Sequence, residues 1–173
     1  WLTAALWPAI PAVAVFVPPD QPQLWDIARD HFGSSTPIQR TESGSHALRL
    51  IFGGVFDRHP GLKVYSVENG SSWVRPLFER FERAHGQMPQ AFKRHPRDQF
   101  IEHIWVSPFY EDDVADLKRH IPVERIVFGS DYPLITPDRW LADFEEAGFK
   151  DAVKPLILKR NAMRLLGLDA AKT

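Results

Sequence analysis

The stretch "RIVFGSDYP" (residues 125–133) joins an apolar run to a polar tip. Residues 126 to 128 have the β-branched and aromatic side chains of a buried strand, and the chain turns where the proline follows. Asp131 stands at this tip. A carboxylate there is either a turn residue or a functional group, because parallel strands present functional side chains at their carboxyl ends. Spacing alone favours neither the turn residue nor the functional carboxylate.

Further apolar runs at 13–17, 62–68 and 100–108 predict strands. Helical patterns separate them, and no hairpin turn joins two neighbouring strands. This alternation predicts an α/β protein with a parallel sheet and crossover helices. A flavodoxin-like open sheet and part of a (β/α)8 barrel both satisfy it. The helices are expected at 23–32, 45–59, 72–86, 111–121, 136–148 and 151–166.

Composition excludes several classes of protein. The 173 residues are 44% hydrophobic and 25% charged, which predicts one globular domain over residues 1–173. Lys and Arg number 21 against 22 Asp and Glu, so no basic excess indicates a nucleic-acid partner. The absence of cysteine excludes disulfides and thiolate chemistry and favours a cytoplasmic location. No apolar stretch reaches the ~18 residues of a membrane span, and the apolar start at 1–19 lacks signal-peptide features.

Glu68 and Asn69 end the strand-like run "KVYSVE". Alternation puts Glu68 on the same face as Val64 and Ser66. On the inner face of a barrel, such a charge would be costly unless it were paired or bound to an ion. By pattern alone, a solvent-exposed loop glutamate is the more frequent outcome, so both interpretations stay open.

The seven histidines form no metal-binding pattern. His103 falls inside the strand predicted at 100–108, several residues before its end, which favours a place in the core over a ligand site. No His-x-His, His-Glu-x-x-His, phosphate loop, nucleophile elbow or dinucleotide turn occurs. The glycines of "IFGG" fall inside a helical pattern, where they suit close packing. The sequence by itself therefore contains no complete metal site.

Three stretches occur together in one order: "IFGGVFDRHPGLKVYSVENGSSWV", "HIWVSPFYEDDV" and "RIVFGSDYP", followed by "LILKRNAMRLLGL" in the last helix. This set resembles the metal-dependent amidohydrolase superfamily, in the branch of aminocarboxymuconate semialdehyde decarboxylase. The resemblance covers residues 45–168. It implies a distorted (β/α)8 TIM barrel, of which this chain supplies the later strands in about four βα units.

The resemblance implies roles for residues at the strand ends. Asp131 matches the aspartate that ends the eighth strand and binds the catalytic metal or acts as the base. Glu68 and Asn69 would end the sixth strand, where relatives carry a catalytic histidine, and they would orient the substrate or a metal-bound group. The residues expected to bind the substrate or line its pocket are Asn69, Trp73, Ser107, Phe109 and Tyr132.

The sequence departs from the family pattern at the metal-binding histidines. The His-x-His of the first strand is absent, and the interval 33–44, where the fifth-strand histidine belongs, holds none. Leu134 follows "DYP" where relatives often have histidine. Two departures fall at abrupt joins, Gly33–Ser34 and Pro133–Leu134. We therefore expect an N-terminal part of the barrel and some barrel-top loops to be missing from this sequence.

The predicted function is metal-assisted hydrolysis or decarboxylation of a small organic acid, ester or lactone, with a divalent ion, expected to be zinc. A small-molecule substrate is the expected partner, without nucleic acid or membrane, and a homo-oligomer is left open. The alternative is a catalytically silent barrel fragment that acts as a binding or oligomerisation module. In that case segment 1–19 would be its interface and Asp131 a turn residue. A nucleotide-binding open sheet ranks lowest because the chain has no phosphate loop.

Overall fold

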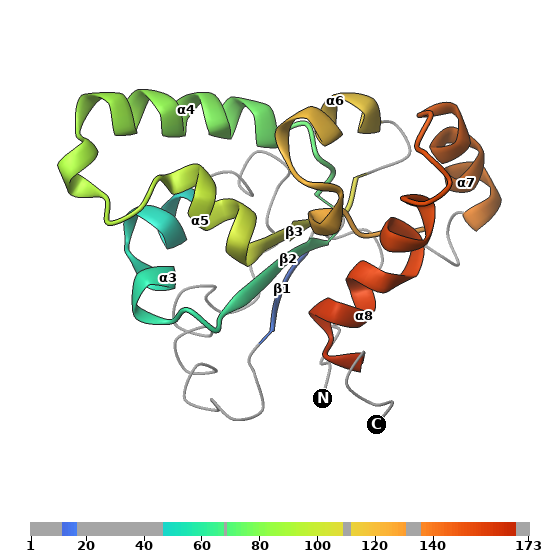
Figure 1. Cartoon of the computed structure of the whole chain (residues 1–173), viewed down its shortest axis with the longest axis horizontal. Coiled ribbons are helices and arrows are strands. Elements are labelled where there is room, and N and C mark those ends of the chain that lie inside the picture. Colours follow the sequence, from blue (N-terminus) through green and yellow to red (C-terminus); the bar gives the residue numbers. More distant parts are fainter. Residues whose placement is uncertain (1–11, 17–46, 68, 109–111, 131–135, 169–173) are drawn as a thin grey trace.

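The computed structural model of the chain describes residues 12–16, 47–67, 69–108, 112–130 and 136–168 (Figure 1). Within them the fold is mixed α/β, with helices packed around a three-stranded sheet. The strands are β1 (Ala12–Phe16), β2 (Lys63–Val67) and β3 (Ile104–Val106), hydrogen-bonded in the order β1-β2-β3. The helix predicted at 23–32 lies outside the described residues.

The strands β2 and β3 run parallel, as the alternation of elements predicts. Ser66 pairs with Val106, and Val106 forms a further parallel bridge with Ile126. The backbone N–H of Val127 donates to the Val106 carbonyl (3.0 Å). The run at 126–130 therefore lies beside β3, but as a single bridged pair rather than the longer strand predicted from its composition.

The strand β1 is antiparallel to β2, which corrects the prediction of an all-parallel sheet. Ala12 faces Val67, and Phe16 faces Lys63. The prediction took strand direction from the alternation of elements, but a connection as long as 17–62 fixes no direction. The pairing covers an edge of β2 whose backbone groups would otherwise be open. The described residues thus form one part of an α/β architecture and not a closed barrel.

Helices cover the sheet on both sides. In Figure 1, α4, α5 and α6 lie above the strands, and α8 lies to their right. Short 3-10 turns occupy Pro89–Ala91 and Val123–Arg125, and a π-helical turn, Leu156–Arg160, leads into α8. The helices are α3 (Val55–Arg58), α4 (Val74–Gln87), α5 (Pro96–His103), α6 (Val114–His120), α7 (Pro137–Glu146) and α8 (Asn161–Leu165).

Helix start and stop signals act where the sequence places them. Pro137 is the first residue of α7, and Gly148 takes a left-handed φ of 64° just past its end. Asp113 caps α6, because its side chain accepts a hydrogen bond from the backbone N–H of Asp116 (2.8 Å). This helix also has an acidic residue in its first turn and basic residues in its last, which suits the helix dipole.

The helix predicted at 45–59 is wrong in one respect, since two glycines divide it. Residues 47–52 are helical, and α3 begins only at Val55. Gly54 has a left-handed φ of 65°, which ends the first piece. A Cβ on Gly53 would lie 2.7 Å from the Arg49 carbonyl oxygen. The glycines of "IFGG" therefore break the helix rather than only permitting close packing within it.

The strand predicted at 100–108 is wrong over 100–103, which belong to α5. His95 and Pro96 start this helix: the His95 Nδ1 accepts a hydrogen bond from the Arg97 N–H (3.2 Å), and Pro96 takes the first helical position. This cap and the helical backbone bonds override the strand-like composition. The last helix is also shorter than predicted, because 151–153 form a turn.

The two faces of the sheet belong to different apolar clusters. On one face Val64 and Val106 pack in the main core, together with Phe100 of α5. On the other face Trp105 packs with Leu165 of α8. Side chains alternate between the faces of a strand, so this division also decides which side chains share a face at the strand ends.

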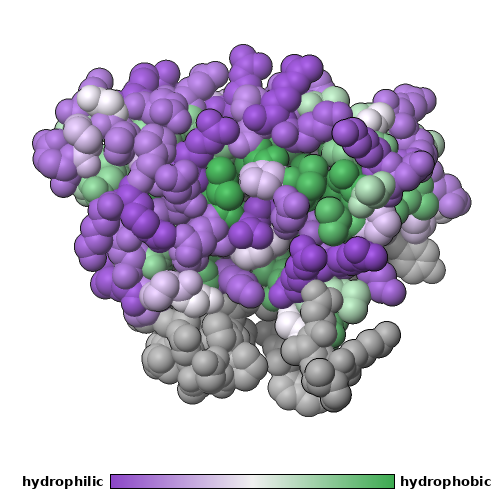
Figure 2. Space-filling model, in the orientation of Figure 1, coloured by the Kyte–Doolittle hydropathy of each residue, from purple (hydrophilic) through white to green (hydrophobic). Residues whose placement is uncertain are grey.

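The surface in Figure 2 is mostly hydrophilic, with apolar residues gathered in the middle of the face, below α6 and around β3. Phe52 and Met88 are among the large apolar side chains that stay exposed. Among the residues that the structure describes, no helix has the length and apolar character needed to cross a membrane.

Candidate functional site

The predicted site residues divide between the described and the undescribed parts of the chain. Asn69, Trp73 and Ser107 are described, and Glu68, Phe109, Asp131 and Tyr132 lie outside the described residues. The strands that lead to the latter are described up to residues 67, 108 and 130. The structure thus describes the strand ends, while the roles predicted for the four undescribed residues stay predictions.

Ser107 lies buried just past the end of β3, where its backbone N–H donates to the Ser66 carbonyl (3.2 Å). Its Oγ packs against Gly129: a Cβ added to Gly129 would lie 2.6 Å from this oxygen and 3.9 Å from the Tyr65 hydroxyl. Protein Cβ atoms do not approach other heavy atoms this closely, so a side chain at residue 129 would force the Ser107 hydroxyl or the backbone to shift. The Ser107 and Tyr65 hydroxyls, from two neighbouring strands, therefore lie beside the backbone of Gly129 at the carboxyl end of the sheet.

Tyr65 joins the candidate site through its hydroxyl beside Gly129, although its position in the sequence does not indicate this. The prediction assigned the site to the face of β2 that carries Val64 and Ser66, but Val64 packs into the main core. Tyr65 lies on the opposite face, with Trp105. The parallel register would have revealed Tyr65. It pairs with Trp105, and Ser107, two residues after Trp105, lies on the same face of the sheet.

Asn69 and Trp73 shape the loop between β2 and α4. The Asn69 side chain is buried, and its Nδ2 donates to the Val67 carbonyl (2.8 Å). The Trp73 Nε1 donates to the Gly70 carbonyl (2.9 Å), and its ring meets Phe100 edge-on with 5.9 Å between centroids. These contacts show that both side chains stabilise the loop. Their contact with a substrate stays a prediction.

A hydrogen bond joins the chain after β2 to the chain after β3. The Ser71 backbone N–H donates to Asp112 Oδ2 (2.7 Å). Gly70, with a left-handed φ of 63°, makes the turn just before it. A charged acceptor makes this bond stronger than one between neutral groups. The Asp112 carboxylate thus holds together the two segments that follow the parallel strands.

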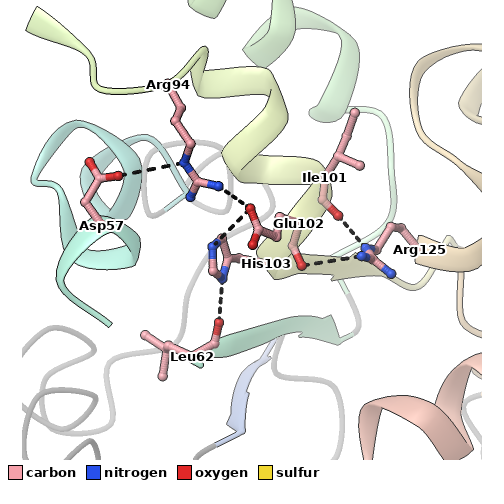
Figure 3. Close-up of polar contacts among 7 residues, drawn as sticks. All are labelled: Asp57, Leu62, Arg94, Ile101, Glu102, His103 and Arg125. Atoms are coloured by element: carbon pink, nitrogen blue, oxygen red, sulfur yellow. Dashed lines mark hydrogen bonds and ion pairs between the residues drawn. The ribbon is translucent and has the colours of Figure 1, made fainter. Parts of the chain in front are cut away.

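His103 is the centre of a second polar cluster, at the amino end of β3 (Figure 3). Its Nδ1 donates to the Leu62 carbonyl (2.8 Å), because a carbonyl can only accept. Its ring stacks on Phe56, with centroids 4.3 Å apart and planes 3° from parallel. Burial lowers the pKa of His103, while the bond to Leu62 and the Glu102 carboxylate oppose that shift. The sequence-based placement of His103 in the core is therefore confirmed.

Two arginines surround this cluster. Arg94 pairs with Glu102, and its Nε lies 4.0 Å from an Asp57 carboxylate oxygen (Figure 3). Arg125 donates to the Ile101 and Glu102 carbonyls, and its guanidinium lies 4.3 Å from the centre of the Trp105 ring. These contacts join the end of α5 to the turn before Ile126, which makes the cluster a structural one.

The described residues do not fit a metal ion by themselves. Among them, no group of three or more His, Asp or Glu side chains comes close enough together to hold one. The side-chain oxygens gathered around Gly129 are the Ser107 and Tyr65 hydroxyls, which are poorer ligands than carboxylate or imidazole. The predicted metal ligand, Asp131, lies outside the described residues.

Comparison with known proteins gives a consistent group of relatives. The Amidohydrolase family model matches residues 6–168. A gamma-resorcylate decarboxylase of Rhodococcus jostii (strain RHA1) is 31% identical over 134 residues, which are 74% of this chain and 41% of that protein. A 2-amino-3-carboxymuconate-6-semialdehyde decarboxylase of Dictyostelium discoideum is 30% identical over 133 residues, 71% of this chain and 36% of that protein.

Solved structures agree with this grouping. A crystal structure of an amidohydrolase from Mycobacterium avium subsp. paratuberculosis K-10 superposes with a TM-score of 0.70 at 35% identity, over 84% of this chain and 39% of that one. A dihydroxybenzoic acid decarboxylase from Polaromonas sp. JS666, with bound manganese and the inhibitor 2-nitroresorcinol, gives 0.64 over 90% of this chain and 48% of that one. At 24% identity, the second comparison concerns the fold alone.

The chain spans about two fifths of the length of these curated relatives, 41% and 36%. The family match nevertheless covers residues 6–168 of 173 and includes every strand and helix that the structure describes. The superfamily resemblance of the strand-end motifs is confirmed by this match. The chain belongs to the amidohydrolase family.

Proposed function

We propose that the protein is a metal-dependent decarboxylase or hydrolase of a small organic acid, and that its strands are the later strands of a (β/α)8 barrel. The observation that carries the proposal is the convergence of the Ser107 and Tyr65 hydroxyls over Gly129, at the carboxyl end of the strands. Enzymes of the barrel fold keep their reacting groups at this end. Asp131 follows Gly129 by two residues in the sequence.

Each predicted residue has a role in this proposal. Asp131 is the metal ligand or the base, and Glu68 and Asn69 orient the substrate. A divalent ion, expected to be zinc, would polarise a carbonyl group or activate a water molecule. Manganese is the second ion to test, because the Polaromonas relative binds it. The remaining residues proposed to line the substrate site are Trp73, Ser107, Phe109 and Tyr132, to which the geometry adds Tyr65.

A hydroxybenzoate is the first substrate to test. The Rhodococcus relative is a gamma-resorcylate decarboxylase, and a related crystal structure holds 2,6-dihydroxybenzoate. Neighbouring hydroxyls such as those of Ser107 and Tyr65 can both donate to a carboxylate and accept from a phenol. These groups suit recognition of a ring that carries a carboxylate beside hydroxyl groups. Decarboxylation is therefore our first candidate reaction, and hydrolysis of an ester or lactone is the second.

Turnover tests the proposal directly. The purified protein, loaded with Zn²⁺ or Mn²⁺, is incubated with 2,6-dihydroxybenzoate, and carbon dioxide release is measured alongside a panel of esters and lactones. We expect Asp131→Asn to lower kcat/KM by about 100-fold or more, the range typical of removing an acid–base group. Asp138→Asn, an exposed aspartate in the first turn of α7, is the matched control and should leave turnover unchanged.

The rival proposal is a catalytically silent module that binds a partner or forms oligomers. It predicts no turnover of any substrate in the panel, no metal retained after metal-replete expression, and no difference between Asp131→Asn and Asp138→Asn. Sedimentation at several protein concentrations would then measure self-association, the property that such a module would keep.

A further inference from the structure

The C-terminal helical segment is hydrogen-bonded directly to the strand region that leads to Asp131. The Nδ2 of Asn161 donates to two carbonyls, those of Val123 (2.7 Å) and Ile126 (2.8 Å). The backbone N–H of Phe128 donates in the other direction, to the Ile157 carbonyl (3.1 Å). Asn161 is 1% exposed, so water does not compete for these bonds. Packing alone would not hold the two segments in so definite a register.

The π-helical turn explains why a helix carbonyl is available to the strand. In a regular α-helix the Asn161 N–H would donate to Ile157, four residues back. Here it donates to Leu156, five residues back. The Ile157 carbonyl is therefore released from the helix and accepts the Phe128 N–H instead. Single π-turns of this kind inside α-helices occur frequently at functional sites.

The strand region is held from both sides. On one side, the Val127 N–H donates to Val106 of β3 (3.0 Å). On the other side, Asn161 and Ile157 hold the residues just before and just after Val127. The next residue on the Val127 face is Gly129, beside the Ser107 hydroxyl. A shift of this region along its own axis would move Gly129 relative to Ser107.

We propose that Asn161 is a positioning residue: through its two bonds to Val123 and Ile126 it sets how far the strand region extends toward the site, and so where Asp131 is delivered. Its part in catalysis rests on the function proposed above for Asp131. Its effect on the strand does not, because that follows from the hydrogen bonds alone.

The amide is suited to this task for a simple chemical reason. One NH2 group carries two donors, and the two carbonyls of Val123 and Ile126 each take one. A carboxylate of the same size has no donor and would place its oxygens against two carbonyl oxygens. The substitution Asn161→Asp therefore removes both bonds when the carboxyl is ionised and at least one when it is protonated, with almost no change in the volume of the side chain.

Gln99 of α5 provides the matched control. It is also 1% exposed, and its Oε1 has no hydrogen-bond partner among the described residues. Gln99→Glu makes the same change of amide to carboxylate at a buried helical position, with the same cost of burying a carboxyl group. It leaves the bonds between the C-terminal segment and residues 123–128 in place.

The test combines amide hydrogen exchange with kinetics, at a temperature where thermal unfolding shows both variants to be folded. In Asn161→Asp we expect the amides of Val127 and Phe128 to exchange about tenfold faster or more, the effect of losing one to two net hydrogen bonds. We also expect kcat to fall about tenfold, with a smaller change in KM. In Gln99→Glu both quantities should stay within about twofold of the wild type, whatever the loss of Tm.

Each outcome of these two measurements either supports or overturns the positioning role of Asn161. Unchanged exchange at Val127 and Phe128 in Asn161→Asp overturns the inference, and so does faster exchange with wild-type kcat. An equal loss of kcat in Gln99→Glu overturns it as well, since destabilisation would then account for both. If the wild type itself binds no metal and turns over no substrate, the proposed function fails. Faster exchange in Asn161→Asp alone would still support the positioning of the strand.

Discussion

The two ends of β3 carry polar clusters of opposite character. At the amino end, His103 is buried beside an ion pair between Arg94 and Glu102, and its pKa is lowered by burial. At the carboxyl end, the uncharged hydroxyls of Ser107 and Tyr65 meet over a glycine. A perturbed titratable group often marks an active site, but here it lies at the end of the strand where barrel enzymes place stabilising residues. On the function proposed above, position along the strand is the better guide to the active site.

The largest effect on stability should come from the amino-end cluster. His103→Ala removes the stacking on Phe56 and the bond to Leu62, and leaves a cavity in the core. We expect a loss of about 2–4 kcal/mol in the free energy of unfolding. Urea unfolding measures the loss. Turnover per folded molecule should stay at the wild-type value, and a loss of kcat in the folded fraction would contradict the division between the two ends.

Gly129→Ala should affect the carboxyl end, with a moderate cost in stability. The new Cβ would meet the Ser107 Oγ at 2.6 Å, so we expect a loss of about 1–3 kcal/mol from overpacking and a fall in kcat. Gly86→Ala in α4 is the control, since a Cβ there meets nothing within 4 Å. We expect this control to be neutral or to stabilise the protein by up to ~1 kcal/mol.

Ser107→Ala sharpens the test of Gly129. If the clash with the Ser107 hydroxyl causes the loss in Gly129→Ala, the double variant should recover part of that stability, in a double-mutant cycle with a coupling energy of about 1 kcal/mol. Strictly additive losses would mean that the strand ends do not meet as the structure has them.

The pH dependence of stability should come from the amino end. Burial lowers the pKa of His103 from its usual 6.5, so the unfolded chain binds a proton at a higher pH than the folded protein does. His103 therefore contributes full stability above pH 6.5, and this is lost as the pH falls from there toward the folded-state pKa. Thermal unfolding between pH 7.5 and 5.5 should show a smaller fall of Tm in His103→Gln than in the wild type. Equal falls would assign the pH dependence to other groups.

The smallest effect should come from the ion pair beside His103. The side chains of Arg94 and Glu102 are 42% and 49% exposed, and ion pairs at such exposure contribute about 0–1 kcal/mol. Glu102→Gln should therefore change the free energy of unfolding by less than ~1 kcal/mol. A loss as large as that of His103→Ala would mean that the carboxylate, rather than ring packing, stabilises this end.

The parallel pairing of β2 with β3 and the helix boundaries at Pro137 and Gly148 could be predicted, because local signals and the alternation of elements determine them. The direction of β1 could not, since its connection to β2 is long. The first half of the strand predicted at 100–108 is instead the end of α5. The cap at His95 starts this helix, and composition does not reveal it.

The candidate site could be predicted only in part. Ser107 was identified because it ends an apolar run, and the structure does place it at the carboxyl end of β3. Tyr65 was missed because a run of alternating residues does not say which face meets the helices. The roles of Gly129 and Asn161 depend on contacts between segments distant in sequence, which no local pattern contains.

Metal content is the most direct test of whether the carboxyl end of the strands is a metal-dependent active site. After expression with excess Zn²⁺ or Mn²⁺ and removal of free ions, the account predicts about one ion per chain in the wild type and in Asp138→Asn, and a large loss in Asp131→Asn. Equal metal content in Asp131→Asn and Asp138→Asn, or no retained metal in the wild type, would contradict the assignment of the carboxyl end of the strands as a metal-dependent active site.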